Sequence, residues 1–266
     1  MRFKIGEFRC LIVSDGLLKV PDPPAARAGG VAGLPRGEDI EVLCLLIETG
    51  KHRILVDTGC GTRFQPTTGK LVSNLKMAGI QPGEIDIIVH THGHGDHVGG
   101  SFDAQGQPVF PNARFKVAKI EWDYWNRPDD GSLKQRMFAA ARKYYLQIPD
   151  KIDLVDEEAE IIPGLRLSPA PGHTPGNSLL DVQSGGDGLL CIGDAIHSAR
   201  EFKNPEFYTF LDVIPEQALK SRSQILARAA GAGLIIFACH FPFPGLGRIV
   251  RTGQEFKWLP VHFPDS

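Results

Sequence analysis

The chain has 266 residues, of which 42% are hydrophobic and 23% charged, with a formal net charge of −2 at pH 7. This composition is ordinary for a soluble globular protein, and the near-zero charge gives no electrostatic reason to expect nucleic acid or an anionic membrane as a partner. No apolar run approaches membrane-spanning length, and the N-terminal residues lack a signal-peptide core. We therefore expect a cytoplasmic protein.

The hydrophobic pattern predicts a mixed α and β chain. In chain order it indicates a strand at 8–13, a turn at 14–16, a hairpin of strands 41–48 and 52–56, a helix at 71–78, strands at 85–89 and 115–118, a helical run at 132–147, short strands between 161 and 181, a turn at 185–188, a strand at 189–192, a helix at 215–230 and a strand from 234. The Pro/Gly/Ala-rich residues 21–35 have no hydrophobic period and predict an irregular loop, either an edge of the substrate entrance or a surface excursion.

Potential metal ligands crowd into the eight residues that follow the strand at 85–89. The segment His90-Thr91-His92-Gly93-His94-Gly95-Asp96-His97 contains four histidines and an aspartate, donors that suit zinc or a similar divalent ion. Gly93 and Gly95 let the backbone turn sharply enough for alternate side chains to converge. The register His92-x-His94-x-Asp96-His97 places an imidazole and a carboxylate after the histidine pair, enough for two metals. His90 is then the spare residue at the strand end.

Three further donors follow predicted strands or turns. They are His173 in Pro171–Gly176, Asp194 after the strand at 189–192, and His240 after the strand from 234. Because ligands spread from His92 to His240 must share one site, we predict a single domain over 1–266. The five cysteines (Cys10, Cys44, Cys60, Cys191 and Cys239) have no CxxC spacing and lie mostly in apolar strands, so we interpret them as buried free thiols.

The ordered set of donors resembles the ligands of the metallo-β-lactamase-fold hydrolases, and Asp57-Thr58-Gly59 resembles that family's Asp-Thr-Gly element. The resemblance implies a four-layer αββα sandwich of two mixed sheets with outer helices. It assigns His92, His94 and His173 to one divalent metal ion, and Asp96, His97 and His240 to another, with Asp194 as the bridge. Zn²⁺ is the expected metal. Asp57 is expected to orient the His92 loop through a hydrogen bond.

The implied chemistry is hydrolysis by a hydroxide that the two metals share. Asp194 makes antibiotic hydrolysis a poor match, and His94 disfavours the flavo-diiron branch. The most similar groups are the quorum-quenching lactonases and the methyl-parathion-hydrolase-like enzymes. We predict a small hydrophobic lactone or carboxylic ester as substrate, of the acyl-homoserine-lactone type. The alternatives are a phosphotriesterase or arylesterase and, in another class, a catalytically weak member that binds a small molecule for signalling. A homodimer is one option for the oligomeric state.

Two catalytic roles beyond metal binding are predicted. Asp96 could transfer protons, although a metal-bound carboxylate is weakly basic. His197 stands where typical lactonases carry a tyrosine, three residues after the bridging aspartate, and either donates a hydrogen bond to the substrate oxygen or only packs beside the site. The aromatic residues Trp122, Tyr124 and Trp125 are either core or part of a helical flap at about 120–150 that covers the site.

Overall fold

The computed structural model describes residues 1–19, 39–128, 145–146, 148–156, 158–202, 208–209 and 211–263. Their strands form two seven-stranded sheets. The first sheet, in spatial order, contains β1 (Arg2–Ile5), β2 (Phe8–Lys19), β3 (Asp39–Glu48), β4 (Arg53–Val56), β5 (Ile87–Val89), β6 (Arg114–Ala118) and β7 (Ile152–Val155). The second contains β14 (Glu255–Pro260), β13 (Leu246–Thr252), β12 (Ile235–Phe237), β11 (Asp187–Cys191), β10 (Ser178–Ser184), β9 (Leu165–Pro169) and β8 (Ala159–Ile162).

Both sheets are mixed, as expected. Strands β4, β5, β6 and β7 pair in parallel, and β11 pairs with β12 in parallel, while the remaining neighbouring strands pair antiparallel. The helices are α1 (Leu71–Met77), α2 (Gly95–Val98), α3 (Lys119–Asn126) and α6 (Pro215–Ala232), with short 3₁₀ turns η2 (Pro82–Glu84), η3 (Gly99–Ser101), η4 (Pro149–Lys151), η5 (Gly193–Ala195) and η6 (Ala199–Phe202).

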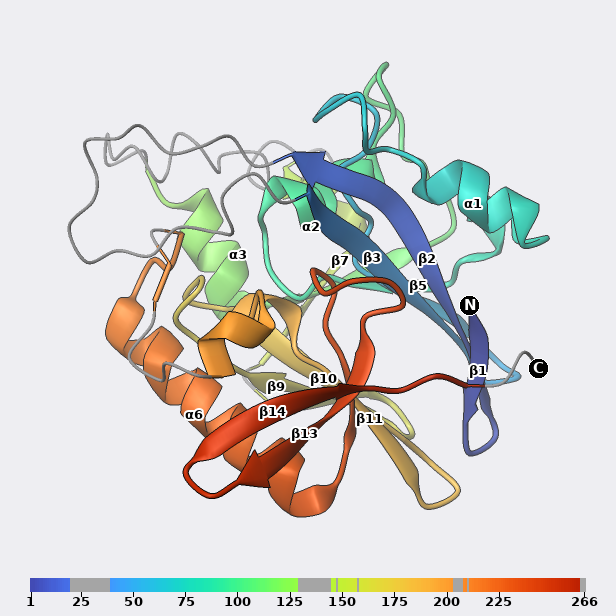
Figure 1. Cartoon of the computed structure of the whole chain (residues 1–266). Coiled ribbons are helices and arrows are strands. Elements are labelled where there is room, and N and C mark those ends of the chain that lie inside the picture. Colours follow the sequence, from blue (N-terminus) through green and yellow to red (C-terminus); the bar gives the residue numbers. More distant parts are fainter. Residues whose placement is uncertain are drawn as a thin grey trace.

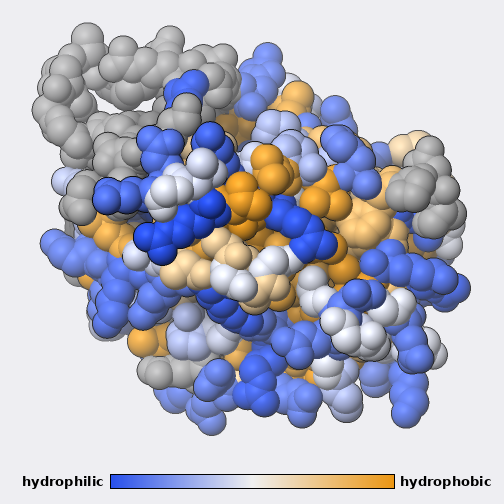
Figure 2. All heavy atoms as spheres, turned by 60° about the horizontal axis from the view of Figure 1, so that its bottom comes forward, coloured by the Kyte–Doolittle hydropathy of each residue, from blue (hydrophilic) through white to orange (hydrophobic). Residues whose placement is uncertain are grey.

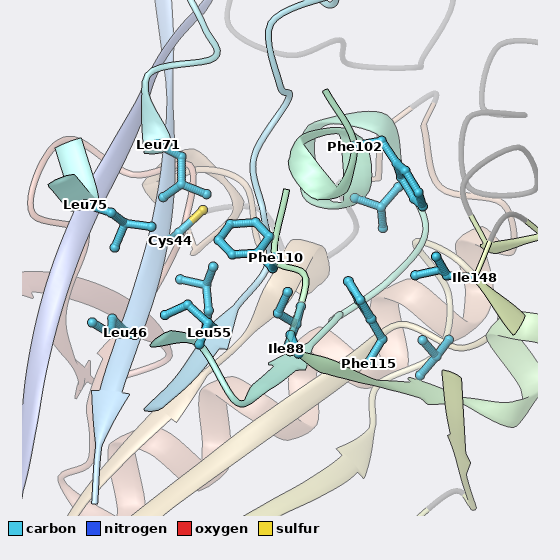
Figure 3. Close-up of a cluster of buried hydrophobic side chains, with 14 of the residues drawn as sticks. Cys44, Leu46, Leu55, Leu71, Leu75, Ile88, Phe102, Phe110, Phe115 and Ile148 are labelled. Carbon is cyan, nitrogen blue, oxygen red and sulfur yellow. The ribbon is translucent and has the colours of Figure 1, made fainter. Parts of the chain in front are cut away.

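The alternation of side chains along the strands builds four layers. Leu45 and Ile47 of β3 belong to the apolar cluster between the sheets, whereas Cys44 and Leu46 belong to the cluster on the outer face of the first sheet. Figure 3 shows Leu71 and Leu75 of α1 closing this outer cluster, with Phe110 beside Leu55. On the far side, α6 packs against the second sheet, and Figure 1 shows it along the outer surface. The predicted αββα sandwich is confirmed.

The apolar pattern of the predicted helix at 215–230 places Ala218, Leu219, Ile225, Leu226 and Ala229 in a buried stripe on one face, and α6 differs from this prediction at one position. Leu219 is half-buried, while Arg222 is 1% exposed and faces the protein interior. The other predicted members of the stripe are buried, namely Ala218, Ile225, Leu226 and Ala229. Arg222 replaces a hydrophobic residue on the inner face because two buried carboxylates lie beside it, at Glu201 and Asp212. A periodicity argument counts only apolar residues and therefore misses such a position.

The predicted turn at 14–16 is wrong, because β2 continues through it. The pairing of β2 with β3 shifts register between Ser14 and Gly16, a β-bulge that bends the strand without ending it. Asp15 occupies the bulge, is fully buried, and accepts backbone N–H bonds from Cys60, Gly69 and Leu71. These bonds fix the loop that precedes α1.

The hairpin of β3 and β4 and the helix before Gly79 are confirmed. The predicted loop at 21–35 and most of the flap at about 120–150 lie outside the described residues, apart from α3 and a few neighbours. The assignment of 1–266 to one domain stays a prediction.

No helix in the described ranges is long and apolar enough to cross a membrane. Figure 2 shows apolar side chains gathered in the upper middle of one face, with hydrophilic side chains around them.

Candidate metal centre

Strand topology brings the predicted ligands to one place. His92 to His97 follow β5 and form the start of α2, and His173 lies in the turn between β9 and β10. Asp194 in η5 follows β11, and His240 follows β12. Because β11 and β12 pair in parallel, the residues after them emerge at the same edge of the sheet. Four separate chain segments therefore deliver their polar side chains to one buried site.

Asp194 divides its two carboxylate oxygens between two groups of histidines. Its Oδ2 lies 3.2 Å from Nε2 of His173 and 3.7 Å from Nε2 of His92. Its Oδ1 lies 3.2 Å from Nε2 of both His97 and His240. His94 joins the first group, with its Nδ1 2.8 Å from Nε2 of His173. This is the arrangement expected of a carboxylate that bridges two metal ions.

The structure thus assembles two groups of donors, each able to hold one ion. The first consists of His92, His94, His173 and Asp194, and the second of His97, Asp194, Cys239 and His240. Asp96, the predicted fourth ligand of the second ion, lies at the margin. Its Oδ2 is 3.5 Å from Nε2 of His240 and 3.9 Å from that of His97, and its side chain is 18% exposed. Cys239 was interpreted only as a buried thiol, so its place among the donors is new.

The histidine rings are held by their other nitrogen. Nδ1 of His97 lies 2.8 Å from Asp57 Oδ2, Nδ1 of His173 lies 3.2 Å from Asp212 Oδ1, and Nδ1 of His240 donates to the backbone oxygen of Glu41 at 2.8 Å. The Nε2 atoms of His92 and His97 are buried and make no hydrogen bond to any residue that the structure describes. Buried nitrogens of this kind, aimed at a carboxylate, fit a metal ion, since ligating histidines bind through one nitrogen and donate from the other.

The electrostatics of the two donor groups differ. In the first group, burial lowers the pKa of His92 and His94 well below the ordinary histidine value, so both imidazoles stay neutral and keep a lone pair for a metal. In the second group, burial lowers the pKa of His97 and His240, but the neighbouring acidic groups, Asp194 among them, outweigh burial and raise it well above the ordinary histidine value. Burial opposes the ionisation of Asp194, but the histidines around it outweigh burial and hold the pKa of its carboxyl well below its usual range. Burial raises the pKa of the Cys239 thiol to about 12, so this sulfur is protonated until a metal displaces the proton.

The Asp57-Thr58-Gly59 element supports the metal loop, as predicted. Asp57 accepts hydrogen bonds from the backbone N–H and the hydroxyl of Thr91, and it contacts the ring of His97. Thr58 donates from its N–H and its hydroxyl to the carbonyl of His97. At Gly59, with φ of 69°, a Cβ would lie 2.5 Å from the Asp15 carboxyl carbon. Each position therefore serves the geometry of the loop rather than ligation.

Glu121 of α3 ties the two ligand loops together and was not predicted. Its buried carboxylate accepts the N–H of Gly93 at 2.7 Å and the N–H of Gly176 at 2.9 Å. It also accepts the indole N–H of Trp125 at 2.6 Å. Burial raises the pKa of Glu121 above its ordinary value, although these hydrogen bonds oppose the shift. In the sequence, Glu121 is a single glutamate among aromatic residues. Its spacing from the metal loops matches no motif, so the sequence alone does not connect them.

A second buried network supports His173 and His197 from α6. Arg222 NH2 lies 2.9 Å from Glu201 Oε2 and 3.9 Å from Asp212 Oδ2. Asp212 contacts His173, and Glu201 accepts the N–H groups of His197 and Ser198 at 2.7 and 2.9 Å. Arg222 thus pairs with the two carboxylates that hold these histidines in place. Sequence reasoning missed all three residues because they lie far apart in the chain and match no motif.

His197 faces the first group of donors. Its Nε2 lies 3.4 Å from Asp194 Oδ2, and its Nδ1 lies 3.6 Å from Glu201 Oε1. Burial lowers its pKa, but the carboxylates of Asp194 and Glu201 outweigh burial and raise the pKa to about 10. Two cations beside Asp194 would act in the opposite direction, so we expect a neutral His197 in the metal-loaded protein.

A cavity of about 570 Å³ opens beside His197 and His240. This is within the usual range for small-molecule sites. One wall is apolar and is formed by Leu17, Ile40, Phe241, Pro242, Phe243, Pro244, Leu246, Trp258 and Pro260. A larger, shallower cavity of about 810 Å³ lies over β8 to β11 and contains none of the predicted ligands. The smaller cavity is the one of the two that is lined by residues of the predicted site, His197 and His240.

The aromatic residues of α3 belong to the core, as one of the two interpretations predicted. Tyr124 and Trp125 are buried, and Trp122 packs on the same cluster with its ring 5.8 Å from that of Tyr145. Trp125 also lies against the ring of His94, at 5.7 Å between centroids. Among the described residues, the apolar lining of the cavity comes from β2, β3 and segments near the C-terminus. His90, the predicted spare histidine, is buried against Phe115 and Tyr145 and belongs to neither donor group.

All five cysteines are buried and free, as expected.

The fold and the two donor groups together indicate the family to which the chain belongs. Residues 37–240 match the family model of the metallo-β-lactamase superfamily, and the chain belongs to this superfamily. Among characterised relatives, an N-acyl homoserine lactonase from Bacillus thuringiensis is 26% identical over 227 residues, which cover 76% of this chain and 82% of that protein. The uncharacterized protein YobT from Bacillus subtilis is 33% identical over 226 residues, covering 80% and 86%.

Two solved structures are similar along nearly their whole length. AidC, a dizinc quorum-quenching lactonase in complex with the product N-hexanoyl-L-homoserine, has a TM-score of 0.89 at 30% identity, covering 100% of this chain and 98% of that one. The hydrolase AbOPH has a TM-score of 0.87 at 28% identity, covering 99% and 98%. The chain therefore has the metallo-β-lactamase fold, with lactonases among its relatives.

Proposed function

We propose that the protein is a binuclear metal-dependent hydrolase that opens lactones or carboxylic esters, with N-acyl homoserine lactones as the leading substrate class. The observation that carries the proposal is the bridging geometry of Asp194, whose two oxygens face two separate groups of buried histidines. Two divalent ions held there, with Zn²⁺ expected, would activate a water molecule as the nucleophile and stabilise negative charge on the substrate. The relatives named lactonases support this substrate class.

Residues of the chain hold the metal ligands and the substrate in position. Asp57, Asp212 and the Glu41 carbonyl orient the ligand histidines, so that each presents Nε2 to the site. His197 lines the cavity beside Asp194, and its ring can donate a hydrogen bond to the substrate oxygen. We assign to Asp96, whose side chain is 18% exposed, the transfer of a proton to the leaving alkoxide. The apolar wall would bind the acyl chain and exclude water around it.

A second candidate is the hydrolysis of aryl esters or phosphotriesters at the same ions. The aromatic side chains of Phe241, Phe243 and Trp258 in the cavity favour it, because flat aryl leaving groups stack on such rings. Complete donor groups argue against a protein that only binds a small molecule, since a binding module has no need for a bridging carboxylate. Metal content together with turnover of a p-nitrophenyl ester separates these classes.

The test is a side-by-side assay of metal-loaded protein on a homoserine lactone with a medium-length acyl chain, an aryl ester and a phosphotriester. We expect about two metal equivalents and a kcat/KM for the lactone at least about tenfold above the others, equivalent to about 1.4 kcal/mol in the barrier. Chelator-treated protein is the control and should lose turnover. A metal content of one that added metal does not change would contradict the binuclear site, and a phosphotriester turned over fastest would favour the second candidate.

A further inference from the structure

Cys239 lies on the buried side of the second donor group, beside the bridging carboxylate. Its Sγ is 3.5 Å from Asp194 Oδ1 and 3.6 Å from the carbonyl oxygen of Gly193. The residue is 5% exposed and follows β12, whose parallel pairing with β11 brings it to the edge where Asp194 emerges. Asp96, with a side chain that is 18% exposed, lies 3.5 Å from Nε2 of His240 and 3.9 Å from Nε2 of His97.

The separations of Asp194 Oδ1 from the other three donors of this group match those between ligands of one ion. Donors on a tetrahedral zinc, with bonds of about 2.0 Å to nitrogen or oxygen and about 2.3 Å to sulfur, lie about 3.3 Å apart for nitrogen and oxygen and about 3.5 Å apart when one is sulfur. Asp194 Oδ1 lies 3.2 Å from Nε2 of His97 and of His240 and 3.5 Å from Sγ of Cys239. Nε2 of His97, 2% exposed as a residue, makes no hydrogen bond within the described part of the chain. An ion among these four atoms would satisfy it.

We propose that the thiolate of Cys239 is a ligand of the second metal ion, together with His97, Asp194 and His240. The inference rests on the proposed binuclear site and adds a donor to it. On binding, the S–H bond breaks, a sulfur–metal bond forms, and one proton leaves to solvent. A soft thiolate favours Zn²⁺ or Co²⁺ over Mn²⁺ and Mg²⁺, so Cys239 would also bias the choice of metal at this position.

Cobalt substitution tests the ligand directly, without an activity assay. Protein loaded with two equivalents of Co²⁺ should show a near-ultraviolet thiolate-to-cobalt charge-transfer band. Cys239→Ser keeps a hydrogen bond to Asp194 but provides no thiolate, and it should lose the band. Cys191→Ser is the matched control, because Cys191 is equally buried but packs between the sheets, outside both donor groups. A wild-type protein with two bound Co²⁺ and no band, or a band that persists in Cys239→Ser, would overturn the proposal.

X-ray absorption of the zinc-loaded wild-type protein needs no variant and covers the case in which Cys239→Ser does not fold. We expect one sulfur neighbour per two zinc ions, at about 2.3 Å. Two bound zinc ions with only nitrogen and oxygen neighbours would remove the Cys239 ligand and leave the proposed function intact. A protein that binds no divalent ion under any loading would remove both.

Discussion

Asp57 Oδ2 lies 2.8 Å from Nδ1 of His97, and the aspartate reaches it from a left-handed backbone conformation with φ of 60°. Asp57 is the one non-glycine residue with positive φ among the described residues. Such a conformation is unfavourable for most side chains, and it persists where the surrounding structure enforces it. Here it aims one carboxylate at both the Thr91 N–H and the His97 ring, which links the end of β4 to the metal loop.

Asp57→Asn should weaken metal binding at the second position by about 10–100-fold, the usual effect of removing a carboxylate that orients a ligating histidine. Asparagine tolerates the left-handed conformation, so the backbone is retained while the charge is lost. Competition with a chromophoric chelator measures the affinity. Unchanged affinity for both ions would show that Asp57 acts only on the backbone of the loop.

Asp194→Asn should reduce the number of bound ions from two to one and lower turnover more than His92→Ala or His240→Ala does. Asparagine has nearly the same volume, but it loses the charge that offsets two cations and the second equivalent oxygen. The loss of affinity should exceed the roughly 10–100-fold effect of removing a residue that only orients a ligand. Elemental analysis and kinetics on the same samples provide the readout. A fully metallated, near-normal variant would mean that Asp194 is not the bridge.

His197→Ala should lower kcat/KM for a lactone by roughly 10–10³-fold, the range for removing one hydrogen-bond donor to a developing oxyanion. His197→Tyr should restore much of the loss on lactones and less on phosphotriesters, because a tyrosine hydroxyl donates from a longer side chain. Metal content must be equal in all samples. Two variants that both behave as wild type would assign His197 to packing alone.

Phe243→Ala should raise KM for long-chain substrates by about tenfold, with little change in kcat or in KM for short-chain substrates. The expected loss corresponds to about 1.4 kcal/mol of apolar contact with the acyl chain. Phe64→Ala is a matched control, since both phenylalanines are 49% exposed but Phe64 does not line the cavity. Equal effects of the two substitutions would show that the cavity wall does not contact the acyl chain.

Glu121→Gln should destabilise the protein by about 1–3 kcal/mol, because the amide places N–H groups against the donors of Gly93, Gly176 or Trp125. Urea unfolding of the metal-free wild type and variant measures the difference, and a difference near zero would exclude the link between the two loops.

The same pair of proteins should differ in pH dependence. The pKa of Glu121 is raised in the folded state, so its favourable contribution is complete below the unfolded pKa of about 4.3 and is lost as pH rises through the folded value. The stability difference between wild type and variant should therefore shrink as the pH rises above about 4.3. A difference that grows over this range would mean that Glu121 is stabilised as the carboxylate.

The sequence by itself determined a mixed α and β chain, many of its strands and the order of the donors, whereas the layers of the sandwich followed from the family resemblance. Apolar runs of period two mark strands, and each ligand follows such a run or sits in a Pro/Gly turn, so His92, His173, Asp194 and His240 were identifiable from local pattern alone. The Asp-Thr-Gly element was identifiable for the same reason, because its three residues are contiguous.

Only the tertiary structure decided which oxygen of Asp194 faces which histidines, and which residues hold the ligands in place. Glu121 lies 55 residues from Gly176, and Arg222 reaches Ala195 across 27 residues, so no spacing rule relates them. Cys239 had the features of an ordinary buried thiol until β11 and β12 placed it 3.5 Å from the bridging carboxylate. The local sequence pattern shows which face of a strand or helix is buried. A metal centre depends instead on the distances between chain segments, and the packing of the two sheets sets those distances.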